Sequence, residues 1–188
     1  MKHAMILFAF AAALVGCDRA PEIHETNVSV EDVAAQVGGA TINPGRWESK
    51  VMIDDVDIPG MPAATKERMK GAMTRQQNVT FDYCVSPDEA KRPGEKFFTG
   101  NDRANCRFER FDMAGGKIDA VMRCDAGQGG TMTMTRTGTY SADSYAASVA
   151  MNISGPGGGM SMKGRAEGRR VGPCTGDEEN LKVEGAKR

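Results

Sequence analysis

Three segments in the last third of the chain alternate residues of two kinds, which predicts β-strands over 131–140, 145–153 and 160–168. The odd positions of the first segment are all threonine. The opposite face of the three strands is mostly apolar or small: Met132, Met134, Arg136, Gly138, Tyr140; Tyr145, Ala147, Val149, Met151, Ile153; Met160, Met162, Gly164, Ala166, Gly168. The expected pairs across the turns are Tyr140–Tyr145, Met134–Met151, Met132–Ile153, Met151–Met162 and Ala147–Ala166. A shift by one residue would break all of these matches, so the sequence predicts this register.

A β-hairpin is predicted over 106–125, because the turn at 114–117 contains a Gly-Gly pair that suits a tight turn. The apolar parity switches within the first strand, and a one-residue bulge near 109–110 explains the switch. The expected pairs are Met113–Ile118, Phe111–Ala120 and Phe108–Met122. The same register places Cys106 opposite Cys124.

The cysteines fit an oxidising compartment. Without Cys17, the chain keeps Cys84, Cys106, Cys124 and Cys174. An even number in an exported chain predicts two disulfides, which can be connected in three ways. The hairpin register favours Cys106–Cys124 and therefore Cys84–Cys174.

Further elements precede the hairpin. Alternation predicts strands over 46–54 and 79–83. Ser29 is a suitable N-cap for a short helix that ends at Gly38-Gly39, and a longer helix is expected over 63–76. Residues 86–89 form a capping-box pattern with proline at the first helical position.

The N-terminus carries a targeting signal. Residues 4–15 are almost entirely apolar, but they fall short of the ~20 residues that span a bilayer, so they are typical of a signal peptide. This segment ends in Leu14-Val15-Gly16-Cys17, which resembles the bacterial lipobox, whose cysteine is diacylated and becomes the new N-terminus. We expect membrane attachment through Cys17 and a position facing the periplasm. Asp18 favours the inner over the outer membrane.

These elements predict a mainly β fold. The seven strands should form an antiparallel up-and-down meander that makes a curved sheet or an open barrel, with one or two short helices. The expected organisation is a signal peptide over 1–16, a lipidated cysteine and polar tether over 17–28, a single β-rich domain over 29–174, and a polar tail over 175–188.

Charge and motifs exclude several function classes. Lys plus Arg number 24 and Asp plus Glu number 25, so the chain lacks the basic footprint of a nucleic-acid-binding protein. Both histidines, His3 and His24, lie near the N-terminus, which argues against a His-rich metal site in the domain. The chain has no GxSxG, HExxH, P-loop or dinucleotide-binding motif. We therefore expect neither an enzyme nor a bound cofactor.

Short motifs follow one another through the domain in a recognisable order. They are Pro44-Gly45-Arg46-Trp47-Glu48, Ile58-Pro59-Gly60-Met61-Pro62, Tyr83-Cys84 with Pro87 and Ala90, Cys106, Cys124, Thr139-Tyr140, and Gly168-Arg169-Arg170-Val171-Gly172-Pro173-Cys174. Together they resemble the bacterial domain-of-unknown-function family 3617. The resemblance implies an exported domain, often preceded by a signal or lipobox, with no assigned activity and no catalytic residues to carry over. The Gly-rich loop at 155–159 and the Arg-rich stretch before Cys174 depart from the family pattern.

Methionines offer one candidate chemistry. Five of them should gather at one end of the apolar face: Met132, Met134, Met151, Met160 and Met162. Thioethers are soft ligands for Cu(I) or Ag(I). Methionine also fills irregular cores, which is the structural interpretation of the same cluster.

A strip of small residues offers the second candidate site. The expected ligand pocket comprises Trp47, Arg136, Gly138, Ala147, Gly164 and Ala166. The space that these small residues leave has three interpretations. Trp47 or a helix fills it, the sheet bends sharply there, or a cavity accepts an apolar ligand. Arg136 and Arg170 share the face and either hold an acidic headgroup or extend to the rim. The sequence thus supports an envelope protein that binds an apolar ligand or an envelope partner protein. The alternatives are a purely structural or stress-related protein, and Met-based metal buffering.

Overall fold

The structure is a computed structural model that describes residues 22–37, 42–77, 79–91, 105–176, 178 and 181–183. Its strands are β1 (Ile23–Ser29), β2 (Gly45–Asp57), β3 (Val79–Val85), β4 (Cys106–Ala114), β5 (Lys117–Gly127), β6 (Gly130–Tyr140), β7 (Ser144–Gly155), β8 (Gly158–Gly172) and β9 (Leu181–Val183). Its helices are α1 (Val30–Val37), α2 (Ala63–Gln77) and α3 (Pro87–Lys91). The strands form one sheet in the order β1-β4-β5-β6-β7-β8-β2-β3-β9, and neighbouring strands are antiparallel.

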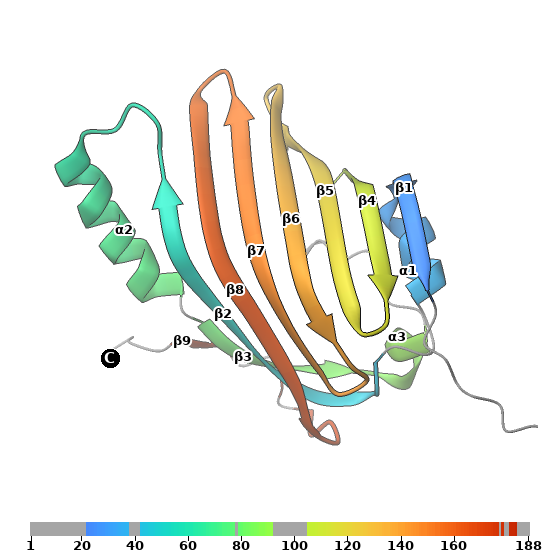
Figure 1. The fold of residues 1–188 in the computed structure, drawn as a ribbon. Coiled ribbons are helices and arrows are strands. Elements are labelled where there is room, and N and C mark those ends of the chain that lie inside the picture. The colour runs from blue at the N-terminus through green and yellow to red at the C-terminus, as the bar shows by residue number, and fades with distance from the viewer. Residues whose placement is uncertain are drawn as a thin grey trace, which may run out of the picture.

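The predicted fold class is confirmed, with a correction to its strand count and connections. Strands β4 to β8 are a meander whose neighbours follow chain order, but β2 and β3 are added beyond β8, and β1 is added beyond β4. The sheet is open and strongly curved, with β1 at one edge and β9 at the other (Figure 1). The described part of the chain has nine strands where alternation predicts seven.

The two extra strands lie in segments that the sequence assigns to polar extensions. Strand β1 pairs with β4, so the tether predicted over 17–28 is wrong for residues 23–28. Asn27 has φ 53°, in the left-handed region, and this irregularity interrupts the alternation that would have identified the strand. At the other end, β9 pairs with β3, so the predicted tail over 175–188 is wrong for residues 181–183. The predicted signal peptide and Cys17 lie outside the described residues.

The predicted registers are confirmed. Strands β4 and β5 pair Cys106 with Cys124, with a register shift between Phe108 and Arg110 where the bulge is expected. Strands β6, β7 and β8 show the expected pairs Tyr140–Tyr145, Met134–Met151, Met132–Ile153, Met151–Met162 and Ala147–Ala166. Both disulfides, Cys106–Cys124 and Cys84–Cys174, connect as predicted.

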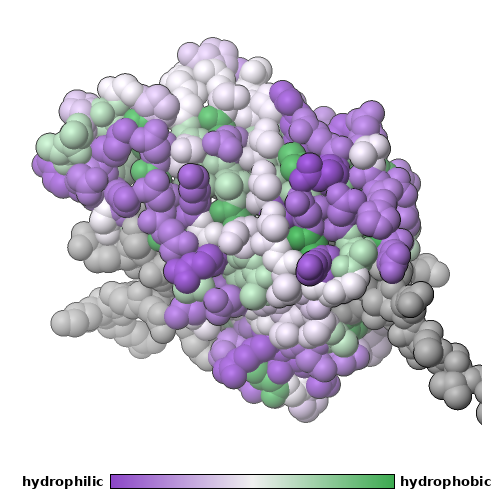
Figure 2. Space-filling model, viewed as in Figure 1, coloured by the Kyte–Doolittle hydropathy of each residue, from purple (hydrophilic) through white to green (hydrophobic). Residues whose placement is uncertain are grey.

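The two faces of the sheet differ in chemistry. We call the face with the β6 threonines the outer face, and the face with Met132, Met134 and Arg136 the inner face. On the outer face, pale, mildly polar side chains run down the middle between strongly hydrophilic flanks (Figure 2). Arg–carboxylate ion pairs link neighbouring strands of the sheet: Arg110–Asp119, Arg123–Glu109, Arg165–Asp54 and Arg169–Glu48. The hydrogen bond from Arg165 lowers the pKa of Asp54.

Helix α1 covers one end of the inner face. Ser29 caps it as predicted, because its Oγ accepts a hydrogen bond from the Asp32 N–H at 3.0 Å. The buried residues of the helix are Val30, Val33, Ala34 and Val37, and they share a core cluster with side chains of β1, β4 and β5. This cluster stabilises the β1 edge of the sheet.

Helix α2 precedes strand β3 in the chain, and helix α3 follows it. Helix α2 packs beside β2 (Figure 1). Lys66 and Lys70 form ion pairs with Asp57 and Asp55 at the end of that strand. Before α3, the predicted capping box is present: the Glu89 N–H donates to Ser86 Oγ at 3.2 Å and the Ser86 N–H donates to the Glu89 carboxylate at 2.9 Å.

Candidate functional site

A small, shallow apolar hollow of about 20 Å³, open to solvent on one side, lies on the inner face over β4, β5 and β6. Two rows of cross-strand neighbours form its floor and walls: Phe111–Ala120–Arg136 and Phe108–Met122–Met134. Ile118 completes the lining. The hollow forms because Ala120, in the middle of the first row, is too short to fill the space between Phe111 and Arg136.

Arg136 is the charged residue of this lining. Its Nε atom is buried and has no hydrogen-bond partner. Arg136 forms no ion pair with any carboxylate in the described ranges. Burial lowers the pKa of Arg136, yet a guanidinium stays protonated in proteins. A buried N–H donor without an acceptor is unfavourable for folding, so this position calls for a reason other than stability.

The structure places the hollow elsewhere than the predicted pocket. Of the six predicted residues, Arg136 lines the hollow, and Trp47, Gly138, Ala147, Gly164 and Ala166 do not. The small residues instead allow close approach between strands. A Cβ on Gly138 would lie 2.1 Å from the Ala146 carbonyl oxygen, and one on Gly164 would lie 2.3 Å from that of Met52. Of the interpretations open at the sequence level, close packing of a bent sheet holds for this strip.

Trp47 belongs to a second core cluster. Its side chain is buried with Val85 and Ala90, and its ring stacks on Tyr145 with centroids 6.4 Å apart. The indole N–H donates to the Asn43 carbonyl oxygen at 3.1 Å. Trp47 therefore fixes the β2 end of the inner face rather than lining a cavity.

A hydroxyl network lies next to Trp47. Ser49 is fully buried, and its Oγ shares a hydrogen bond with the Tyr145 hydroxyl at 2.5 Å. Tyr83 also hydrogen-bonds within this network, and burial raises the pKa of its hydroxyl. These hydroxyls satisfy one another, so they join β2, β3 and β7 rather than wait for a ligand.

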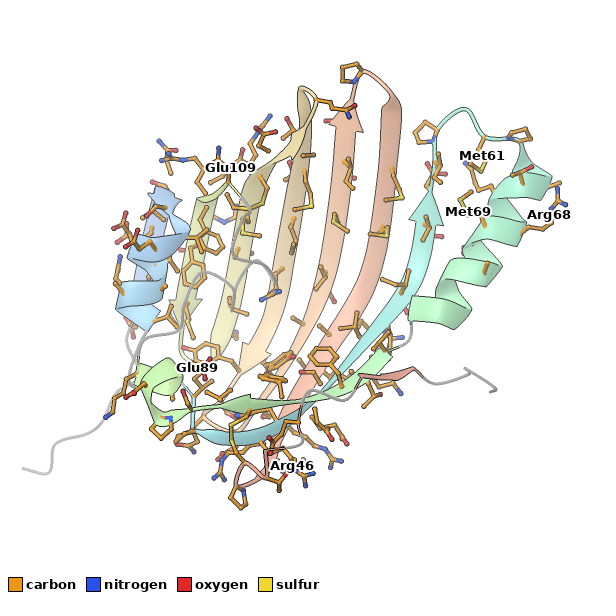
Figure 3. All side chains as sticks on the ribbon, turned by 180° about the vertical axis from the view of Figure 1, so that it is seen from behind. Arg46, Met61, Arg68, Met69, Glu89 and Glu109 are labelled. Carbon is orange, nitrogen blue, oxygen red and sulfur yellow. A yellow bond between two sulfur atoms is a disulfide. The ribbon has the colours of Figure 1, made fainter. Side chains whose placement is uncertain are left out.

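The predicted methionine cluster is assembled by strand pairing. Met134, Met151 and Met162 occupy adjacent positions on β6, β7 and β8, and Ile153 and Met160 are neighbours in the next row. The five methionines are partly exposed. Thioether sulfurs stand out on this face in Figure 3, which views the sheet from behind. Within the described residues, no group of three or more His, Cys, Asp or Glu side chains is placed to hold a metal ion.

Metal binding by the thioethers stays a prediction. If Cu(I) binds Met134, Met151 and Met162, adding it under reducing conditions should raise the melting temperature of the protein. Met134→Leu with Met151→Leu should abolish the rise while preserving the apolar packing. A melting curve that Cu(I) leaves unchanged in the parent protein would remove this function.

The hollow and its surroundings define a class of protein: a single open antiparallel sheet, fixed by two disulfides, whose apolar inner face is largely buried over β4 and β5 and partly exposed over β6, β7 and β8. Residues 42–174 match the family model described as "Protein of unknown function (DUF3617)". The chain belongs to this family, as its motifs predicted. No curated protein and no solved structure matches the chain.

The matched region contains both disulfides and every residue that lines the hollow. Strand β1 and helix α1 precede it. None of the helices in the described residues is both long and apolar enough to cross a membrane.

Proposed function

We propose that this protein is a lipid-anchored envelope protein, facing the periplasm, whose inner face binds an apolar ligand. The observation that carries the proposal is the hollow over β4, β5 and β6, which combines an apolar lining with a single cationic side chain. Ligand sites typically have this composition, in which apolar walls supply most of the contact and a few polar groups fix orientation.

The location rests on two features of the sequence. Leu14-Val15-Gly16-Cys17 supplies a lipid attachment point at the end of a short apolar segment. The four remaining cysteines pair in two disulfides, which persist in oxidising compartments such as the periplasm. Asp18 favours the inner membrane. The enzyme class stays disfavoured, because the sequence offers no catalytic motif.

The shape of the inner face favours binding over a purely structural role. A structural domain would gain stability by filling this face, yet its methionines are partly exposed beside an open hollow. Methionine side chains are flexible, so they adapt to apolar partners of varied shape. An accessible apolar surface of this kind commonly marks a binding site.

A neutral fluorescent probe, N-phenylnaphthylamine, tests apolar binding. The protein is produced in the periplasm behind an ordinary secretory signal with Cys17→Ser, so that neither lipid nor detergent competes. We expect the probe to bind with increased fluorescence. Met134→Lys should weaken binding about tenfold or more, because it places a second cation in the apolar hollow.

Thr133→Lys is the matched control, since Thr133 is the neighbour of Met134 in the chain and lies on the outer face of β6. It should bind the probe as the parent protein does. The proposed function fails if the parent protein does not bind the probe, or if the two lysine variants lose binding equally.

A further inference from the structure

We propose that Arg136 makes the hollow selective for an aliphatic chain that ends in one carboxylate, which is the chemistry of a fatty acid. This inference rests on the proposed function, because it names the ligand class of the same site. Its basis is the juxtaposition of a guanidinium, whose buried Nε has no hydrogen-bond partner, with an apolar hollow that opens onto the row of methionines.

The surroundings of Arg136 explain why its partner should be a ligand. Arg136 lies across from Ala120 on β5 and Val149 on β7, and neither neighbour offers an acceptor group on its side chain. The Tyr145 hydroxyl interacts electrostatically with Arg136, but the buried Nε of Arg136 donates to no acceptor. The remaining residues of the hollow are apolar. A cation in such a place attracts an anion strongly, since little water or protein screens the interaction.

The exposed arginines of the outer face are paired. Arg110, Arg123, Arg165 and Arg169 are exposed, and each forms an ion pair with a carboxylate at 2.5–3.2 Å. The protein would lose little stability if these exposed arginines had no partners. Two described arginines, Arg46 and Arg136, have a buried Nε without a hydrogen-bond partner, and of these only Arg136 lines the hollow.

The chemistry of the head group follows from the number of charges. One guanidinium balances one negative charge, and its planar fork fits a carboxylate with two parallel hydrogen bonds. Arg170, the other arginine expected on this face, does not line the hollow. Its Nε donates to the Pro44 carbonyl oxygen at 2.7 Å. A doubly charged phosphate monoester would therefore keep one uncompensated charge in apolar surroundings.

The course of the aliphatic chain follows from the strand register. Next to the Arg136 row lies a row of three partly exposed methionines, Met134, Met151 and Met162, on β6, β7 and β8, which continues from the buried Met122 on β5. Two strand spacings of ~4.8 Å make the exposed row about 10 Å long. A ligand whose head contacts Arg136 can lay its chain along these thioethers.

Displacement of bound N-phenylnaphthylamine tests the inference with three ligands that share a twelve-carbon chain: dodecanoate, dodecanol and dodecyltrimethylammonium, each below its micelle concentration. We expect dodecanoate to displace the probe at about one tenth of the dodecanol concentration or less, and the cationic ligand to be the weakest. Arg136→Met should abolish the preference for dodecanoate and keep the binding of the probe.

Two further variants keep the outcome unambiguous. Arg123→Met removes an exposed arginine of the outer face and should keep the preference of the parent protein. Arg136→Lys keeps the charge without the planar fork and should keep only part of the preference for dodecanoate. Circular dichroism confirms the fold of each variant.

The inference is overturned if dodecanol competes as well as dodecanoate, or if Arg136→Met retains the preference. In both cases binding of the neutral probe would persist, so the proposed function would stand. Absence of probe binding to the parent protein would instead remove the proposed function itself.

Discussion

Replacing Cys84 and Cys174 together with alanine should lower the free energy of unfolding by about 4.6 kcal/mol. The disulfide joins residues 90 positions apart, so its removal releases a long loop in the unfolded chain. It also connects β3 to the segment that follows β8, and thereby holds together two parts of the sheet that β2 separates. Urea denaturation, followed by circular dichroism, measures the change.

The second disulfide provides the control. Cys106 and Cys124 are 18 positions apart and lie on paired strands, so their double replacement with alanine should lower the free energy of unfolding by about 3 kcal/mol in the same loop model. A larger loss from the Cys106–Cys124 pair than from the Cys84–Cys174 pair would show that loop length does not dominate the stabilisation.

Trp47→Ala should lower the free energy of unfolding by about 3 to 5 kcal/mol, the range observed for large aromatic side chains in cores. Trp47 is only 1% exposed, and its removal would leave a cavity between Val85, Ala90 and Tyr145. The Asn43 carbonyl oxygen would also lose its donor. Denaturant unfolding followed by far-ultraviolet circular dichroism is the suitable measurement, because Trp47 is the protein's single tryptophan and the variant has no tryptophan fluorescence.

Trp47→Phe keeps an aromatic ring at this position and should lose clearly less stability than the alanine variant. Thr137→Ala, at an exposed outer-face position, should change the free energy of unfolding by less than about 0.5 kcal/mol. Equal losses for Trp47→Ala and Trp47→Phe would contradict the packing described for this cluster.

The meander could be predicted from the sequence because two independent signals agree there. Alternation assigns the faces of β4 to β8, and the turns between these strands fix which residues pair. The bulge near residues 109–110 was recognisable for the same reason, since the parity of apolar positions changes between Phe108 and Phe111. The cysteine pairing followed from this register.

The rest of the sheet depends on contacts that no local pattern records. The left-handed backbone at Asn27 obscures β1, and β9 is only three residues long. The pairing of β2 with β8 joins segments more than 100 positions apart. Such pairings are selected by tertiary packing, so their place in the sheet is not written in nearby residues.

The candidate site was predicted in part for a related reason. Arg136 was recognisable as a charged residue on an apolar face. The hollow beside it, however, depends on the pairing of β5 with β6, which places Ala120 next to Arg136. The hairpin had already placed Phe111 opposite Ala120, so extending the predicted register by one strand would have found it. The glycines that suggested open space instead mark close contacts between strands.

Methyl NMR of the methionines during titration with dodecanoate tests the central claim, that the hollow on the inner face is the ligand site, most directly. The prediction is that the methyl signals of Met122, Met134 and Met151 shift together and saturate. Met61, which precedes α2, and Met69, which lies on α2 (Figure 3), serve as internal controls and should not move. Unchanged signals throughout, or shifts confined to Met61 and Met69, would contradict the account.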